Sequence, residues 1–291
     1  MIINFGSINI DHVYRVPHFV APGETLGSTA YSKGLGGKGF NQSIALYRAG
    51  APVRHVGCIG ADDAGNGAWL HTQLSELGLD LSGIQSVDTA TGHALIQVND
   101  DGENCILLYP GANHALSEVQ IQAELNHASA EWVLLQNETN AIDTIINQAH
   151  AAGKKVVFNP APCRPELAQL PLHKLHTLIV NEIEAQQLSG QSDLSAALDQ
   201  LSTLCQNIIL TLGGDGVRYI GEAGAQFVAA KKVEVVDTTA AGDTFIGYYL
   251  ASMAQGMDVR SALERANAAA AITVTRLGAV SAIPFAHELT I

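Results

Sequence analysis

The sequence predicts an α/β fold with a doubly wound, mostly parallel sheet in one principal domain and a small β appendage. From residue 117 onward, short apolar runs typical of buried strands alternate regularly with helical stretches. Between residues 91 and 110 two runs of alternating apolar and polar residues flank an Asn-Asp-Asp-Gly turn. This pattern predicts a separate hairpin that could cover another part of the molecule. Hydrophobic residues make up 47% of the 291 residues, enough for a large core.

Apolar runs, with glycine or proline where they stop, place the expected elements along the chain. The first strand is expected at residues 1–5, and Pro17, Pro22 and Gly23 mark the loop that comes later. Further buried strands are expected at 53–59, 132–135, 156–158, 178–180 and 208–210, with a short antiparallel addition at 217–220, 225–228 and 233–236. Helices are expected at 38–50, 68–77, 241–255 and 259–275.

Charge and cysteine content exclude several classes of function. Fifteen basic and 28 acidic residues give a net charge of −13, which should repel nucleic acid, so no nucleic-acid partner is expected. The four cysteines are far apart and form no Cys-x-x-Cys pair, which favours reduced thiols over a disulfide framework or a metal cage. The first residues lack the features of a signal peptide and no apolar run could cross a membrane, so a cytoplasmic protein is expected.

The most informative motif is the segment DTTAAGDTF, residues 237–245. Small residues at Ala240, Ala241 and Gly242 let backbone amides face one point at the start of a helix, which is typical of a phosphate or oxyanion site. Asp243 could be an ordinary capping acid. Because a carboxylate beside an anion site is costly, the combination instead favours a residue that accepts a proton.

Three further polar segments follow expected turns or strands. The glycine-rich segment 34–41 is neither a dinucleotide fingerprint, because no buried strand precedes it, nor a P-loop, because Gly39 follows Lys38. It is either a tight turn or a loop that brings Lys38 and Asn41 to a polar ligand. Asn9 and Asp11 would share one side of an extended chain and could hold adjacent hydroxyls, or form an Asx turn. Residues 211–216 are either a hairpin turn or a loop laid along a nucleotide.

Together these segments resemble the ribokinase-type sugar kinases, a family that also includes fructokinases and adenosine kinases. The resemblance spans nearly the whole chain and rests on the ordered motifs GSINIDH, GGKGFNQ, TGHALIQV, NDDGEN, QNET, NPAP, NE, TLGGDG, DTTAAGDTF and AAAAITVTRLGA. It implies one kinase domain over residues 1–291, a β-sheet lid formed by roughly 12–34 and 91–110, and a homodimer made through the lid.

The resemblance also implies the roles of individual residues, including Asp243 as the base and 240–243 as the anion hole. The sugar would be held by Asn9, Asp11, Gly37, Lys38, Asn41, Glu138 and Asp243 and covered by Ala94, Ile96 and Leu108. The ATP site would be lined by Asn181, Thr211, Gly213, Gly214, Asp215, Gly216, Gly242 and Asn267. A K⁺ site would be formed, mostly by backbone carbonyls, at Asp237, Thr239, Thr273, Arg276 and Gly278.

The predicted reaction is ATP-dependent phosphorylation of a primary hydroxyl, with D-ribose at O5 favoured and Mg²⁺ bridging the phosphates. The alternatives are a kinase of deoxyribose, fructose or a nucleoside, and a non-catalytic sugar-binding regulator. Phe40 and Tyr109 replace smaller residues of the family and bear on the choice of sugar. Asn267 replaces a histidine often found near the adenine, and Ala282 lacks the hydroxyl usual at the last cation position.

Overall fold

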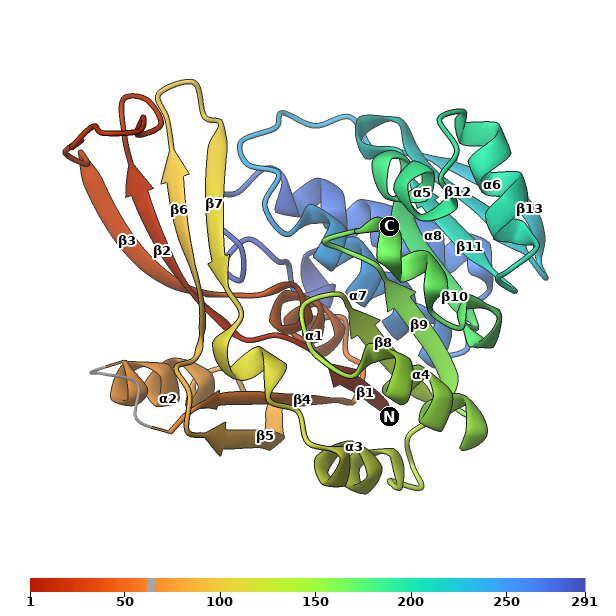
Figure 1. Cartoon of the computed structure of the whole chain (residues 1–291). Helices are drawn as coiled ribbons and strands as arrows, with labels where there is room; N and C mark the ends of the chain where they lie inside the picture. The colour runs from red at the N-terminus through yellow and green to blue at the C-terminus, as the bar shows by residue number, and fades with distance from the viewer. Residues whose placement is uncertain (62–65, 291) are drawn as a thin grey trace.

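The computed structural model describes residues 1–61 and 66–290 and contains two separate sheets (Figure 1). The large sheet consists of β1 (Ile2–Phe5), β4 (Val53–Gly60), β5 (Asp80–Val87), β8 (Trp132–Gln136), β9 (Lys155–Asn159), β10 (Thr177–Asn181), β11 (Ile208–Thr211), β12 (Gly216–Gly221) and β13 (Gly224–Ala229). Their order is β13-β12-β11-β10-β9-β8-β1-β4-β5, parallel except where β12 pairs with β11 and β13. The predicted fold class is therefore confirmed.

Helices cover both faces of the large sheet, because alternate residues of its strands point to opposite sides. Ile2 and Leu134 pack in one core and Ile3 and Val133 in the other. The first core includes α1 (Lys38–Arg48), α2 (Gly67–Ser75), α7 (Ala241–Ala254) and α8 (Val259–Thr273). The second includes α3 (Glu118–Leu125), α4 (Ile142–Ala151), α5 (Glu182–Ser189) and α6 (Leu194–Ser202).

A close approach joins α1 to α7. Gly247 of α7 lies against α1, and a Cβ there would fall 2.9 Å from the backbone nitrogen of Leu46. Only glycine lets the two helix backbones come this near without a shift. The two helices therefore pack closely together in the first core, on one face of the large sheet.

The small sheet consists of β2 (Asn9–Arg15), β3 (Ala30–Gly36), β6 (Gly92–Val98) and β7 (Asn104–Tyr109), in the order β3-β2-β6-β7. It stands beside the α/β body, at the left of Figure 1. Most of the strand residues of this sheet come from the segments expected in the lid, 12–34 and 91–110, although 16–29 form a connection outside the strands. Its β6–β7 hairpin is the one predicted, and only Gly36 of β3 is buried, consistent with a segment that is no buried strand.

Strand register assigns side chains to the two faces of the small sheet. Asp11 pairs with Gly34 and Ala94, and Ala94 pairs with Leu108, so these residues share one face. Because neighbouring residues of a strand point to opposite sides, Tyr109 lies on the other face. We call the Asp11 side the inner face and the Tyr109 side the outer face.

One expected strand is wrong. Residues 233–236 carry three valines but form no strand, because the amides of Val236 and Asp237 donate to the carbonyl of Val274 at the end of α8. Val235 is 60% exposed, so this run does not join the core. Conversely, β5 was not expected from the sequence, since few of its residues are buried.

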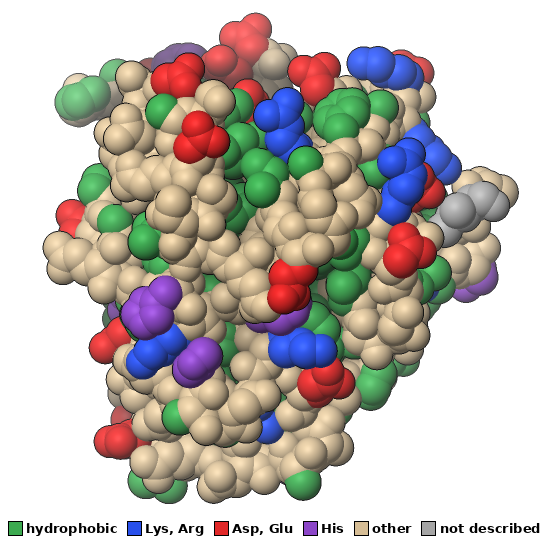
Figure 2. Space-filling view, turned by 90° about the vertical axis from the view of Figure 1, so that its right-hand side faces the viewer, with side chains coloured by type: hydrophobic (Ala, Val, Ile, Leu, Met, Phe, Trp, Pro, Cys, Tyr) green, Lys and Arg blue, Asp and Glu red, His purple; other side chains and the backbone are tan. Residues whose placement is uncertain are grey.

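The surface and helix lengths bear on partners. No helix in the described part of the chain is both long enough and apolar enough to cross a bilayer. On the face that looks to the right in Figure 1, which includes β13, acidic and basic side chains are interspersed (Figure 2). The four cysteines are free thiols.

Candidate active site

Residues that follow the carboxyl ends of parallel strands form the candidate site. Ser7 and Asn9 come soon after β1, Glu138 follows β8, and Asn181 ends β10. Hydrogen bonds from the first turn of α1 reach both Glu138 and Asp243, so the starts of α1 and α7 meet at this edge. Ligands of open α/β sheets bind at such an edge.

Asp243 lies in the first turn of α7 and is 8% exposed. Ala240 just before the helix adopts a left-handed conformation, φ 60°, and its carbonyl accepts from the Thr244 amide at 2.8 Å. Asn41 Nδ2 donates to Asp243 Oδ2 at 3.0 Å, and Gln42 Nε2 donates to Oδ1 at 2.9 Å. The carboxylate is therefore held on both oxygens, beside helix-terminal amides that favour an anion.

The glycine-rich segment positions Lys38 against a second carboxylate. Glu138 Oε2 accepts from the Ser7 hydroxyl at 2.5 Å and from the Lys38 amide at 2.9 Å. Gly37 has φ 94°, and a Cβ at Gly39 would lie 2.5 Å from the Ser7 nitrogen. These glycines press the start of α1 against the β1–β2 connection, where a side chain would not fit.

Charges at the site influence one another strongly. Burial alone would lower the pKa of the Lys38 ammonium, but Asp243, Glu138 and Glu184 outweigh it and raise this pKa. Burial raises the pKa of Glu138, although Lys38 opposes the effect. Burial, helped by the Glu138 charge, raises the pKa of Asp11 to about 6. One cation among several carboxylates suits a ligand with many hydroxyl donors.

Asn9 is oriented by Asn113, a residue that the sequence did not predict for the site. Its Oδ1 accepts from Asn113 Nδ2 at 2.7 Å, and Asn113 Oδ1 in turn accepts from the Ile8 amide at 2.8 Å. A Cβ at Gly92 would lie 2.5 Å from Asn9 Oδ1, so glycine leaves room for this pair. The amide group of Asn9 is thus left to donate toward the site.

The residues predicted for ATP lie along the neighbouring strand ends. Asn181 caps α5. Its side-chain Oδ1 accepts from the backbone amide of Glu184 at 2.8 Å, and its backbone amide donates to Glu184 Oε2 at 3.0 Å. Gly216 pairs with Ala229 across β12 and β13, and Asn267 Nδ2 donates to the Ala229 carbonyl at 3.3 Å. The structure therefore brings the 211–216 turn and Asn267 to the same part of the molecule.

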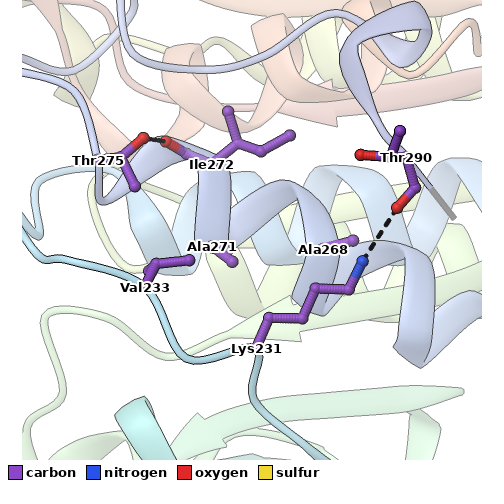
Figure 3. A pocket seen from close by; sticks show the side chains of 7 residues that line it. All are labelled: Lys231, Val233, Ala268, Ala271, Ile272, Thr275 and Thr290. Atoms are coloured by element: carbon purple, nitrogen blue, oxygen red, sulfur yellow. Dashed lines mark hydrogen bonds between the residues drawn. The ribbon is translucent and has the colours of Figure 1, made fainter.

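A cavity of about 150 Å³ lies beside α8 in this region (Figure 3). The Lys231 side chain extends along one end of the cavity, and its Nζ donates to the Thr290 carbonyl at 3.1 Å. Lys232, the next residue, donates to the Gly214 carbonyl at 3.4 Å and so links this segment to the predicted nucleotide turn. The cavity is lined by Lys231, Val233, Ala268, Ala271, Ile272, Thr275 and Thr290.

Asp237 joins the two segments predicted to hold K⁺. Its Oδ1 accepts from the Thr239 amide at 2.9 Å and hydroxyl at 2.7 Å, and its Oδ2 accepts from the Gly278 amide at 2.9 Å. Burial opposes ionisation, but these hydrogen bonds prevail and lower the pKa of Asp237. Thr273 instead donates to Thr244 Oγ1 at 3.0 Å, in the core of the α7–α8 pair.

The two bulky departures from the family pattern do not lie on the inner face. Phe40 is fully buried, with its ring centroid 5.6 Å from that of His55 in the core. Tyr109 lies on the outer face, 5.0 Å from the ring of His93. The expectation that these residues select the sugar is therefore not supported by their positions.

Four residues of the site were not predicted: Ser7, Gln42, Asn113 and Glu184. Glu184 had a usable signal, because an Asn followed three residues later by Glu is the pattern of a capped helix start. The side-chain contacts of the other three depend on segments distant in sequence, so local pattern could not identify them.

Comparison with known proteins identifies the family. Residues 1–286 match the profile of the pfkB family carbohydrate kinases. The chain belongs to this family. The resemblance drawn from the motifs is thereby confirmed, and so is the enzyme class, a carbohydrate kinase.

Individual pfkB relatives are similar over almost their full length. Ribokinase of Haemophilus influenzae is 38% identical, with 97% of this chain and 95% of that protein covered. Deoxyribokinase of Salmonella typhi is 31% identical, covering 96% and 94%. The structure of Arabidopsis thaliana ribokinase complexed with ribose and ATP superposes with a TM-score of 0.86 at 27% identity, covering 99% and 96%.

Proposed function

We propose that this carbohydrate kinase transfers the γ-phosphoryl group of ATP to O5 of D-ribose and forms ribose 5-phosphate. The observation that carries the proposal is Asp243, a buried carboxylate in the first turn of α7, beside Lys38 and Asn41 of α1. The ribokinases among its relatives, one of which binds ribose and ATP, support the choice of substrates.

Asp243 acts as the general base. It accepts the proton of the sugar O5 hydroxyl while O5 bonds to the γ-phosphorus and the bond to the leaving ADP oxygen breaks. Because the transition state is loose, the proton leaves late and a weak base suffices. The amides of residues 240–243 and the α7 dipole stabilise charge on the migrating group.

The sugar binds between the start of α1 and the inner face of the small sheet. Asp11 and Glu138 accept hydrogen bonds from its hydroxyls, and Lys38 and Asn9 donate to its oxygens. The small sheet acts as a lid and covers the sugar with Ala94, Ile96 and Leu108. Ala94 and Leu108 share the inner face with Asp11, as this role requires. Closure excludes water, which limits wasteful hydrolysis of ATP.

The nucleotide binds along the ends of β10 and β11. Asn181, residues 211–216 and Asn267 line it, and the apolar wall of the cavity beside α8 provides a surface for the purine. Glu184 and Asn181 are the residues suited to hold Mg²⁺, since hard oxygen ligands suit that ion. The ion would neutralise charge on the phosphates.

The monovalent cation belongs to the loops joined by Asp237. Carbonyl oxygens near Thr239, Arg276 and Gly278 suit K⁺, and the Asp237 hydrogen bonds already hold the two segments together. The ion would order the loop before α7. Equal activity in K⁺ and in a large organic cation would contradict this assignment.

A second copy of the chain is the proposed partner of the outer face of the small sheet. Leu107 is 68% exposed there, with Tyr31, Leu95 and Tyr109 also exposed on the same face. Leu107→Glu should shift the protein from dimer to monomer in analytical ultracentrifugation. A wild-type protein that sediments as a monomer at micromolar concentration would contradict the dimer.

A substrate panel with the purified protein tests the activity. ADP release should be fastest with D-ribose and slower with 2-deoxyribose, fructose and nucleosides, and Asp243→Asn should lower kcat by ~10²–10⁴-fold with the fold intact. Preference for 2-deoxyribose would support the deoxyribokinase alternative, which the Salmonella relative favours. Ribose and ATP binding without turnover would favour a non-catalytic regulator.

A further inference from the structure

A chain of buried amides leads from Asp243 into the large sheet. Gln42 Nε2 donates to Asp243 Oδ1, and Gln42 Oε1 accepts from Gln136 Nε2 at 2.7 Å. Gln136 Nε2 also donates to Asn4 Oδ1 at 3.0 Å. Gln42, Gln136 and Asn4 are each at most 1% exposed, so water does not compete for these bonds.

The direction of this amide chain is fixed at its far end. Asn4 Nδ2 donates to the Gly39 carbonyl at 2.7 Å, and a backbone carbonyl can only accept. Asn4 must therefore present Oδ1 to Gln136, and Gln136 must present its amide nitrogen. Gln42 in turn must present Oε1 to Gln136, which leaves its nitrogen facing Asp243.

A second anchor gives the same orientation. Asn159 Nδ2 donates to the Ile179 carbonyl at 3.0 Å, so Asn159 Oδ1 faces Gln42 Nε2, at 3.5 Å. Rotation of the Gln42 amide would place its oxygen against both this oxygen and the Asp243 carboxylate. Two independent backbone carbonyls thus hold the Gln42 donor on Asp243 Oδ1.

Asn41, the other donor to Asp243, is not anchored in this way. Its Oδ1 is buried and has no hydrogen-bond partner among the described residues. The Asp243 carboxylate selects the Nδ2 end of the Asn41 amide, because it can only accept. Asn41 therefore has this one anchor, whereas Gln42 is held by Asp243, Gln136 and Asn159. The two amides that hold Asp243 therefore differ in rigidity.

We propose that Gln42 is the positioning residue of the base, that it keeps Asp243 Oδ1 fixed, and that Oδ2 is the oxygen that receives the proton from the sugar. This inference rests on the proposed function of Asp243. Lys38 from α1, Glu138 after β8 and Glu184 from α5 also act on the Asp243 charge. Gln42 differs from them because its side chain is neutral and donates a hydrogen bond directly to Asp243 Oδ1.

Two substitutions test the assignment. Gln42→Leu removes the donor and should lower kcat by ~10- to 100-fold, with KM for ribose and ATP within ~3-fold, because orientation of the base is lost but the binding groups remain. Gln42→Glu keeps the size of the side chain but adds a carboxyl group next to Asp243. It should move the acid limb of the kcat profile upward by ~1 pH unit or more, because like charges disfavour ionisation.

Gln120→Leu is the matched control. Gln120 is also a buried helical glutamine, and its Nε2 donates to the carbonyls of Gly57 and Gly83, outside the site. It should lose comparable stability and keep the wild-type kcat and pH profile. A Gln42→Glu variant that folds and keeps both the wild-type kcat and acid limb would overturn the proposal.

Asp243→Asn separates this failure from that of the proposed function. If Asp243→Asn keeps near-full turnover, the base assignment itself is wrong and Gln42 has nothing to position. If Asp243→Asn is inactive while both Gln42 variants keep the wild-type kcat and pH profile, only the positioning role of Gln42 is wrong.

Discussion

The large sheet and the small sheet supply different parts of one site, and they are built differently. Every residue of β1 and β8 is buried, whereas every residue of β7 is exposed. Asp243 and Gln42 belong to helices packed on the large sheet, and Asp11 belongs to the small one. The proposed chemistry thus depends on a rigid core and the proposed cover on a sheet with little packing to hold it.

The largest expected effect tests how tightly the large-sheet region is packed. Gly39→Ala would place a Cβ against the backbone of Gly6 and Ser7, which cannot move aside as a flexible side chain could. We expect the free energy of unfolding, measured in urea, to fall by about 3 kcal/mol. Gly67→Ala at the start of α2, where no atom of the described residues lies within 4 Å of the added Cβ, should change it by less than about 0.5 kcal/mol. Equal effects at the two positions would contradict the close contact.

The next effect tests how the small sheet positions Asp11 for the sugar. A Cβ at Gly36 would overlap the Asp11 carboxylate, so Gly36→Ala should displace that carboxylate and raise KM for the sugar by ~10-fold or more. Gly34→Ala, two residues earlier, would place a Cβ with no atom of the described part of the chain within 4 Å, and it should leave KM unchanged. Both variants should unfold near the wild-type urea concentration, because the overlap at Gly36 is with a side chain that can move aside and no other residue of β3 is buried. A large loss of stability in Gly36→Ala would show that the small sheet is not the looser part.

The third effect concerns Asp11 and pH. Its pKa rises from 3.8 in the unfolded chain to about 6 in the folded protein, so the unfolded state releases this proton first and folding loses stability between these values as pH rises. Asp11→Asn removes that loss. The variant should gain stability relative to wild type from pH 4 to pH 6 and remain more stable at higher pH, by up to about 3 kcal/mol for a shift from 3.8 to about 6. Urea unfolding at pH 4 and pH 8 measures this, and a constant difference would contradict the raised pKa.

Much of the fold follows from periodicity, because the central strands of the large sheet, such as β1 and β8, are short apolar runs buried on both faces. The exceptions have a physical cause. The 233–236 run has the composition of a strand, but its amides bond to the end of α8 instead of a neighbouring strand. The exposed β5 lacks the apolar run that marks its neighbours. Pairing partners decided both cases, and a single sequence does not show them.

The candidate site was predictable where a motif carried its chemistry within a few residues. Asp243 and its small neighbours are of this kind. Gln42 and Asn113 are not, because each acts through amides contributed by distant strands or turns. Phe40 shows the converse: it belongs to a site motif, yet its side chain turns into the core.

The close contact between α1 and α7 also constrains how the chain folds during synthesis. Residues that cover α1 lie about 200 positions later, since Gly247 packs against Leu46 and Arg48 donates to the Val280 and Ile283 carbonyls. A nascent chain released from the ribosome before α7 would expose the apolar side of α1. Premature termination should therefore yield aggregation-prone fragments, which chaperones that bind apolar segments should retain.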